Sequence, residues 1–230
     1  MSVNTRNFGS SQRYGFAPGA VPIAGDLARS VFSQVMGLVA LTTGTFALGA
    51  FAGQNLSGGF GIVCFLIAFG TLFGLNSASR RGNQQLAVGL LLVFGLLLGL
   101  AFGPVLSAYA RVEPQVLWEA GGATALFVAG LGAFGYSIRT DLAPYARILF
   151  FALLALILVG IIAIFVRIPH FAVLWSLAGL VIFGGFVVFD FNRLRRAGGQ
   201  MAVPIAASIF LDILNIFQFF LILFSGNSRD

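Results

Sequence analysis

The sequence predicts an all-α polytopic membrane protein, a bundle of seven transmembrane helices. The composition is 59% hydrophobic and only 9% charged, and the mean hydropathy is +0.99. Apolar runs of membrane-spanning length recur along the chain, and short loops separate them. A soluble chain of this length has no use for so much apolar surface, and long uncharged runs are typical of transmembrane helices.

Seven apolar segments set the expected number of helices. They cover residues 31–51, 60–75, 86–106, 116–138, 145–166, 171–191 and 202–224. Apolar runs of roughly 17–25 residues cross a ~30 Å hydrocarbon core at ~1.5 Å per residue. Because the loops are short, consecutive helices should be antiparallel neighbours. Glycines in the third segment (Gly95, Gly99, Gly103) and the second (Gly70, Gly74) predict close packing within one chain rather than dimerisation, so we expect a monomer.

Residues 1–25 differ from the rest of the chain. They are rich in Ser, Asn, Gly and Pro, with no helical period and no apolar core of a cleaved signal peptide. We therefore expect a flexible cytoplasmic tail at 1–25 and one seven-helix transmembrane domain at 26–230.

The arginines predict the orientation. All thirteen basic residues are Arg. Ten fall on the side of the N-terminus: Arg6, Arg13, Arg29, Arg80, Arg81, Arg139, Arg147, Arg193, Arg195 and Arg196. Three fall on the other side: Arg111, Arg167 and Arg229. The positive-inside rule places the N-terminus in the cytoplasm and the C-terminus outside. The compact chain indicates a bacterial plasma membrane, with the endoplasmic reticulum as the alternative, and the net charge of +6 indicates contacts with lipid headgroups rather than nucleic acid.

Two aspartates lie inside the last two apolar segments, Asp190 and Asp212. A carboxylate at membrane depth costs ~3 kcal/mol or more, so such residues usually face a bundle interior and serve an ion or proton path. The alternative is a protonated aspartate on each helix that bonds a neighbour. The two positions are nearly equidistant from the intervening turn, so an antiparallel hairpin places the carboxyls at the same depth. Two carboxyls in a low-dielectric setting titrate as a unit and can share one proton, and their oxygens suit transient Ca²⁺ binding.

Other polar residues support this candidate site. Ser208, Asn215 and Gln218 share one helical face with Asp212. Arg193 follows Asp190 by one turn, and Arg80 or Arg81 could approach from the same membrane side. Glu119, near the outer end of the fourth segment, is a candidate for an outer vestibule.

Several classes of function are disfavoured. The chain has no room for a soluble catalytic domain, and its one cysteine, Cys64, permits neither an intrachain disulfide nor a zinc cluster. The absence of Lys excludes a retinal Schiff base. Paired aspartates also serve intramembrane aspartyl proteases, but their Gly-x-Gly-Asp motif is missing. We expect neither an enzyme nor a resident cofactor.

Three stretches carry a family resemblance: residues 135–142, 189–191 (Phe-Asp-Phe) and 210–217 (Phe-Leu-Asp-Ile-Leu-Asn-Ile-Phe). In these the chain resembles bacterial members of the Bax inhibitor family, also called the transmembrane BAX inhibitor motif family. The resemblance implies a pH-sensitive calcium leak gated by aspartates that correspond to Asp190 and Asp212, with a basic latch at Arg80 or Arg81. The chain departs from the family at 189–192, where Phe-Asp-Phe-Asn stands in place of Tyr-Asp-Thr-Gln.

Two hypotheses about function remain. The first is a membrane channel that leaks Ca²⁺ and responds to protons. The second is a non-conducting regulator that binds another membrane protein, such as a membrane protease. Flux in purified liposomes distinguishes them.

Overall fold

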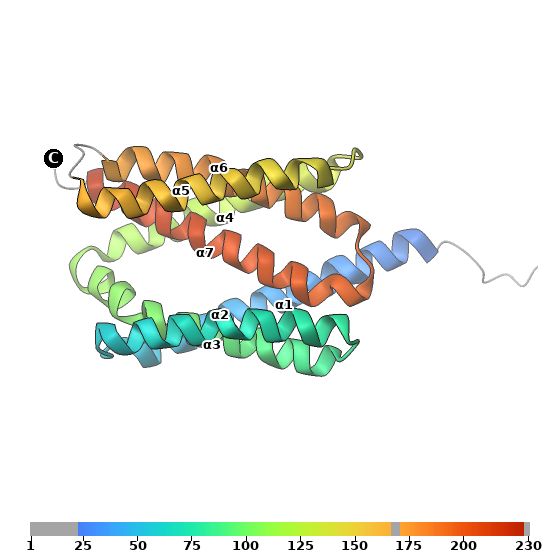
Figure 1. The fold of residues 1–230 in the computed structure, drawn as a ribbon, viewed down its shortest axis with the longest axis horizontal. Coiled ribbons are helices and arrows are strands. Elements are labelled where there is room, and N and C mark those ends of the chain that lie inside the picture. The colour runs from blue at the N-terminus through green and yellow to red at the C-terminus, as the bar shows by residue number, and fades with distance from the viewer. Residues whose placement is uncertain (1–22, 167–170, 228–230) are drawn as a thin grey trace, which may run out of the picture.

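The computed structural model describes residues 23–166 and 171–227, and every element in those ranges is a helix (Figure 1). The elements are α1 (Ile23–Gly53), α2 (Gly58–Arg80), α3 (Gln84–Val112), α4 (Pro114–Ser137), η1 (Ala143–Tyr145), α5 (Ala146–Phe165), α6 (Phe171–Arg196), η2 (Gly199–Met201) and α7 (Ala202–Asn227). The seven α-helices of these ranges are long and apolar enough to cross a membrane. The predicted seven-helix membrane bundle is confirmed. The predicted tail lies outside the described residues, except for its last three residues, which begin α1.

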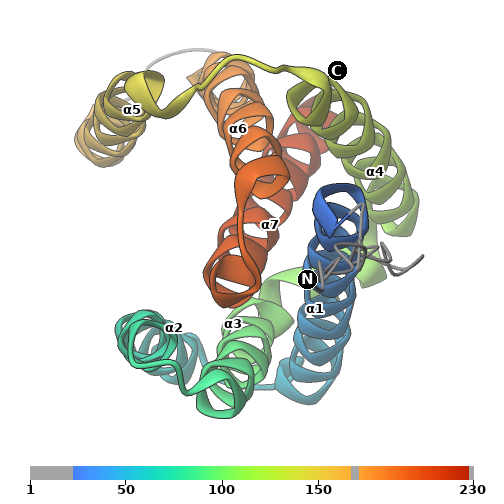
Figure 2. The same cartoon turned by 90° about the vertical axis from the view of Figure 1, so that its right-hand side faces the viewer.

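The central helix is α7, which contacts α4 and α6 on one side and α1 on the other (Figure 2). Its side chains Ile205, Ile209 and Ile216 are fully buried. Phe210 packs edge to face against two aromatic rings, Phe46 of α1 and Phe94 of α3, each with a ring-centroid distance of 5.9 Å. Helix α7 therefore packs against helices on both of its sides.

Glycines bring α3 against α1 almost backbone to backbone. A methyl group added at Gly99 would lie 2.1 Å from the Phe46 carbonyl oxygen, and one at Gly103 would lie 2.7 Å from that of Ala50. Gly95 is equally close to α1. The predicted packing of this stripe within the chain is confirmed. The prediction of close packing is wrong for Gly70, which faces open space because it lies on the exposed side of α2.

The periphery of the bundle is formed by α5, which packs mainly on α6. Most of its apolar side chains are exposed, as lipid-facing side chains are.

The two ends of the bundle differ in charge. The helices α2, α4 and α6 end where α1 begins (Figure 1), and this end, here called the arginine-rich end, carries most of the described arginines. They are Arg29, Arg80, Arg81, Arg139, Arg147, Arg193, Arg195 and Arg196. Arg111 lies in the last turn of α3, at the opposite end. Arg6, Arg13, Arg167 and Arg229 lie outside the described residues.

Candidate functional site

The two membrane aspartates meet between α6 and α7. Asp190 is 1% exposed and Asp212 is 4% exposed. Their carboxyl groups lie within mutual hydrogen-bonding reach. An ionised carboxylate can only accept hydrogen bonds, so a bond between the two requires that one of them carries a proton. The hairpin argument therefore led to the right pair of neighbours.

Ser208 completes this contact. It lies one turn before Asp212 on α7, and its hydroxyl donates a hydrogen bond to Oδ2 of Asp190. Oδ2 of Asp212 is buried and has no hydrogen-bond partner within the described chain. Buried polar atoms are nearly always paired, so an orphaned acceptor in this position marks a place that a proton or cation could occupy. We call Asp190, Asp212 and Ser208 the carboxyl pair site.

Close packing against α4 fixes the position of α6 beside this site. A methyl group at Gly135 of α4 would lie 2.4 Å from the Val188 carbonyl oxygen, and one at Gly132 would lie 2.9 Å from the Phe191 ring. Glycine at both places lets α6 approach α4 on the two sides of Asp190. The carboxyl of Asp190 is thus held on a well-packed helix rather than on a loop.

Asn192, two residues after Asp190, binds the loop between α4 and α5. Its Nδ2 donates to the carbonyl oxygens of Ile138 (2.9 Å) and Thr140 (3.1 Å), and its Oδ1 accepts from the Leu142 N–H (3.3 Å). Asn192 is 2% exposed. One buried amide therefore satisfies three backbone groups of the loop between α4 and α5.

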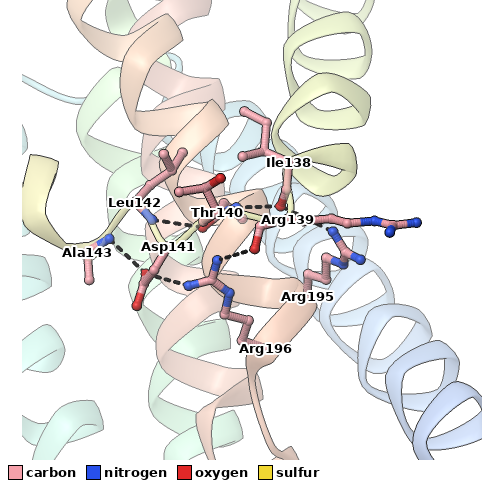
Figure 3. Close-up of polar contacts among 9 residues, drawn as sticks. Ile138, Arg139, Thr140, Asp141, Leu142, Ala143, Arg195 and Arg196 are labelled. Carbon is pink, nitrogen blue, oxygen red and sulfur yellow. Dashed lines mark hydrogen bonds and ion pairs between the residues drawn. The ribbon is translucent and has the colours of Figure 1, made fainter.

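Two arginines reinforce this loop from the end of α6 (Figure 3). Nη1 of Arg195 donates to the carbonyl oxygens of Ser137 (3.2 Å) and Ile138 (3.1 Å). Arg196 donates to the Arg139 carbonyl oxygen (3.1 Å) and forms an ion pair with Asp141. We call these contacts, together with those of Asn192, the loop clamp.

Asp141 in the loop clamp is exposed and ionised. The N–H of Ala143 donates to its Oδ1 at 2.9 Å. This bond, and then the charge of Arg196, hold the pKa of the Asp141 carboxyl below its ordinary value. Asp141 thus stays charged throughout the neutral range.

No hydrogen bond joins the other residues predicted for the site to either aspartate in the described part of the chain. Asn215 donates to the carbonyl oxygen of Leu211 in its own helix (2.8 Å), and Gln218 is half-buried. Arg193 is near enough to Asp190 to act on it electrostatically. The carboxyl of Glu119 is exposed on α4 and accepts from Gln115 (2.9 Å).

The two latch candidates, Arg80 and Arg81, are exposed at the end of α2. No hydrogen bond or ion pair joins either of them to an aspartate in the described part of the chain. The neighbouring Ser79 instead joins α2 to the segment between α6 and α7. Its hydroxyl donates a hydrogen bond to the Gln200 carbonyl oxygen (3.0 Å). The end of α2 is thus fixed to the α6–α7 turn by a neutral side chain.

The fold and the site together define a class: a seven-helix membrane bundle with a buried carboxyl pair on its last two helices. The family described as inhibitor of apoptosis-promoting Bax1 matches residues 28–229, and the chain belongs to this Bax inhibitor family.

Several bacterial proteins are similar along most of the chain. An uncharacterized membrane protein of Vibrio cholerae is 32% identical over 186 residues, which cover 78% of this chain and 82% of that protein. An uncharacterized protein of Caulobacter vibrioides is 29% identical over 160 residues, 65% of this chain and 63% of that protein. One of Chlamydia muridarum is 25% identical over 210 residues, 84% of this chain and 87% of that protein. These relatives support an integral membrane protein.

Proposed function

We propose that the protein is a proton-modulated cation leak channel, permeable to Ca²⁺, whose gate is the carboxyl pair site; it catalyses no reaction. The observation that carries this proposal is the buried contact between Asp190 and Asp212 across α6 and α7. A carboxyl pair at membrane depth is costly, and proteins keep such pairs mostly for ion or proton paths.

In this proposal the described conformation is the closed one. Cavities of about 1590 and 740 Å³ open on the sides of the bundle, and neither is lined by an aspartate. With one shared proton, the carboxyls attract each other and hold α6 against α7. When that proton is lost, two adjacent negative charges repel strongly in a low-dielectric interior. We therefore expect the leak to increase as the pH rises.

Calcium fits this site as the permeant ion of the proposed channel. Two carboxylates and a hydroxyl offer hard oxygen ligands, which Ca²⁺ prefers, but Ca²⁺ usually takes about six to eight of them. No group of three or more His, Cys, Asp or Glu side chains gathers within the described ranges. An ion would keep part of its water shell here and leave readily, as conduction requires.

Calcium flux into dye-loaded proteoliposomes, measured from about pH 5 to 8, tests the gate. Asp190→Asn and Asp212→Asn should each flatten the pH dependence. The double replacement should add little, because the two carboxyls act as one unit. Asp141→Asn is the matched control and should preserve the parent profile. An unchanged profile in Asp212→Asn would show that the gate lies elsewhere.

A non-conducting regulator that binds another membrane protein is the second candidate. The closed surroundings of the pair favour it, because such a protein needs no path to the aspartates. A parent protein without flux at any pH would favour this candidate.

The arginine-rich end is proposed to face the cytoplasm of a bacterial cell. Reporter fusions at the C-terminus should then give an external signal. A cytoplasmic signal would reverse the assignment of the two ends.

A further inference from the structure

A long groove runs along the side of the bundle between α1 and α4. Its volume is about 1590 Å³. The two helices flank α7 (Figure 2), whose side chains Phe210, Ile213 and Leu214 form part of the floor. Small residues of α4, among them Ala125 and Ala129, keep the wall shallow.

The charge of the groove lies at one end. Arg29 is the sole charged side chain among the described lining residues, and it lies exposed at the arginine-rich end. Below it on the same face of α1 is Phe32, and the remaining walls are almost entirely apolar. An apolar slot with one cation at headgroup level is complementary to a lipid with a negatively charged headgroup.

An aromatic bridge narrows the groove next to Arg29. The rings of Phe32 on α1 and Tyr136 on α4 meet edge to face, with a centroid distance of 5.3 Å. A helix about 10 Å wide cannot enter between walls that touch at this point. A flexible acyl chain can pass beside the rings, and aromatic side chains commonly lie at the headgroup level. The bridge therefore favours a lipid over the helix of a partner protein.

We propose that the half of this groove nearest Arg29 binds one anionic phospholipid. Its phosphate pairs with the Arg29 guanidinium, and its acyl chains lie on the α7 side chains that flank Asp212. The bound lipid contacts the same helix as the carboxyl pair site, but its binding does not require that the pair conducts ions.

Native mass spectrometry of the full chain in neutral detergent tests this site, with phosphatidylglycerol and phosphatidylcholine of identical acyl chains as probes. The parent should retain one phosphatidylglycerol in preference to phosphatidylcholine. Arg29→Gln should weaken phosphatidylglycerol binding about fivefold, which is the contribution of one basic residue near an anionic surface. Arg147→Gln is the matched control, because Arg147 is an exposed arginine at the same end that does not line the groove. It should bind as the parent does.

A second variant tests the apolar part of the site. Ala129→Leu places a larger side chain in the groove from an exposed position on α4. It should weaken the binding of both lipids to the same extent. Equal retention of the two lipids by the parent would mean adventitious filling only and would overturn the proposal. Equal losses in Arg29→Gln and Arg147→Gln would overturn it as well. Competition by soluble glycerol phosphate would show that a free phosphate, not a lipid, is bound.

Discussion

The Ser208 hydroxyl on α7 donates a hydrogen bond to the Asp190 carboxyl on α6, and the same helix presents Asp212 one turn later. Two groups of α7 therefore contact one carboxyl of α6. The Ser208 hydroxyl stabilises the ionised form of Asp190, and so does Asp212 while it carries the shared proton, whereas an ionised Asp212 would repel it. The balance between them sets the pH at which the pair loses its proton.

Ser208→Ala should move the midpoint of pH-dependent flux to higher pH by about one pH unit. The removed donor favours ionisation, and a hydrogen bond to a charged group contributes about 1.5–3 kcal/mol, with ~1.4 kcal/mol per pH unit. Flux measured over a pH series checks the shift. Ser176→Ala is the control, because that buried serine bonds only the Ala172 carbonyl oxygen of its own helix (2.7 Å). An identical midpoint in Ser208→Ala and the parent would remove Ser208 from the site.

The fold was predictable from hydropathy and loop length, because membrane spans must be long, apolar and helical. The contact between Asp190 and Asp212 was predictable as well, since residues equidistant from the turn of an antiparallel hairpin lie level. Both arguments need only local sequence and simple helix geometry.

The loop clamp was not predictable, because its partners are backbone carbonyls far away in the sequence. Asn192 bonds the backbone of Ile138 and Thr140. The contact of Ser79 with the Gln200 backbone, which lies outside the clamp, is of the same kind. No residue pattern encodes such partners; the only signal was a buried amide one turn from the end of α6. The sequence pattern likewise gave no sign that Asn215, predicted to support the site, bonds its own helix.

Asn192→Leu should destabilise the protein by about 2–4 kcal/mol. Leucine has a similar size but leaves the Thr140 carbonyl oxygen and the Leu142 N–H without the Asn192 amide, while the Ile138 carbonyl oxygen keeps its bond from Arg195. Each such loss costs about 1–3 kcal/mol when buried. Thermal unfolding in detergent measures the effect. Asn76→Leu is the control, because Asn76 is exposed and bonds only the Leu72 carbonyl oxygen of its own helix. If both variants unfold at the same temperature as the parent, the loop clamp contributes nothing to stability.

The ionisation of Asp141 should not contribute to the pH response of the protein near neutrality. Its pKa in the folded state is lowered, first by the bond from the Ala143 N–H and also by Arg196. A lowered pKa contributes stability that is present above the unfolded value of about 3.9 and is lost as the pH falls through the folded value. Stability from this group is therefore constant from about pH 5 to 8.

A carboxyl NMR titration of Asp141 checks this. In Arg196→Gln the pKa should rise towards its ordinary value without reaching it, because the Ala143 bond remains. Arg195→Gln is the control and should leave the titration unchanged, since Arg195 bonds Ser137 and Ile138 instead. Equal shifts in both variants would mean that Asp141 senses the general charge of the end rather than its ion pair.

Gly99→Ala should destabilise the bundle, although alanine is the better helix former. The new methyl group would lie 2.1 Å from the Phe46 carbonyl oxygen and 2.8 Å from the Ala50 nitrogen, so α1 and α3 would have to separate. Forced overpacking of this kind typically costs about 1–3 kcal/mol. Gly89→Ala in the same helix has no atom within 4 Å of the new methyl group, and it should stabilise the protein by about 0.5–1 kcal/mol. Thermal unfolding of the two variants should therefore shift in opposite directions. A Gly99→Ala variant that kept its stability but changed its oligomeric state would instead place the glycine stripe at an interface between chains.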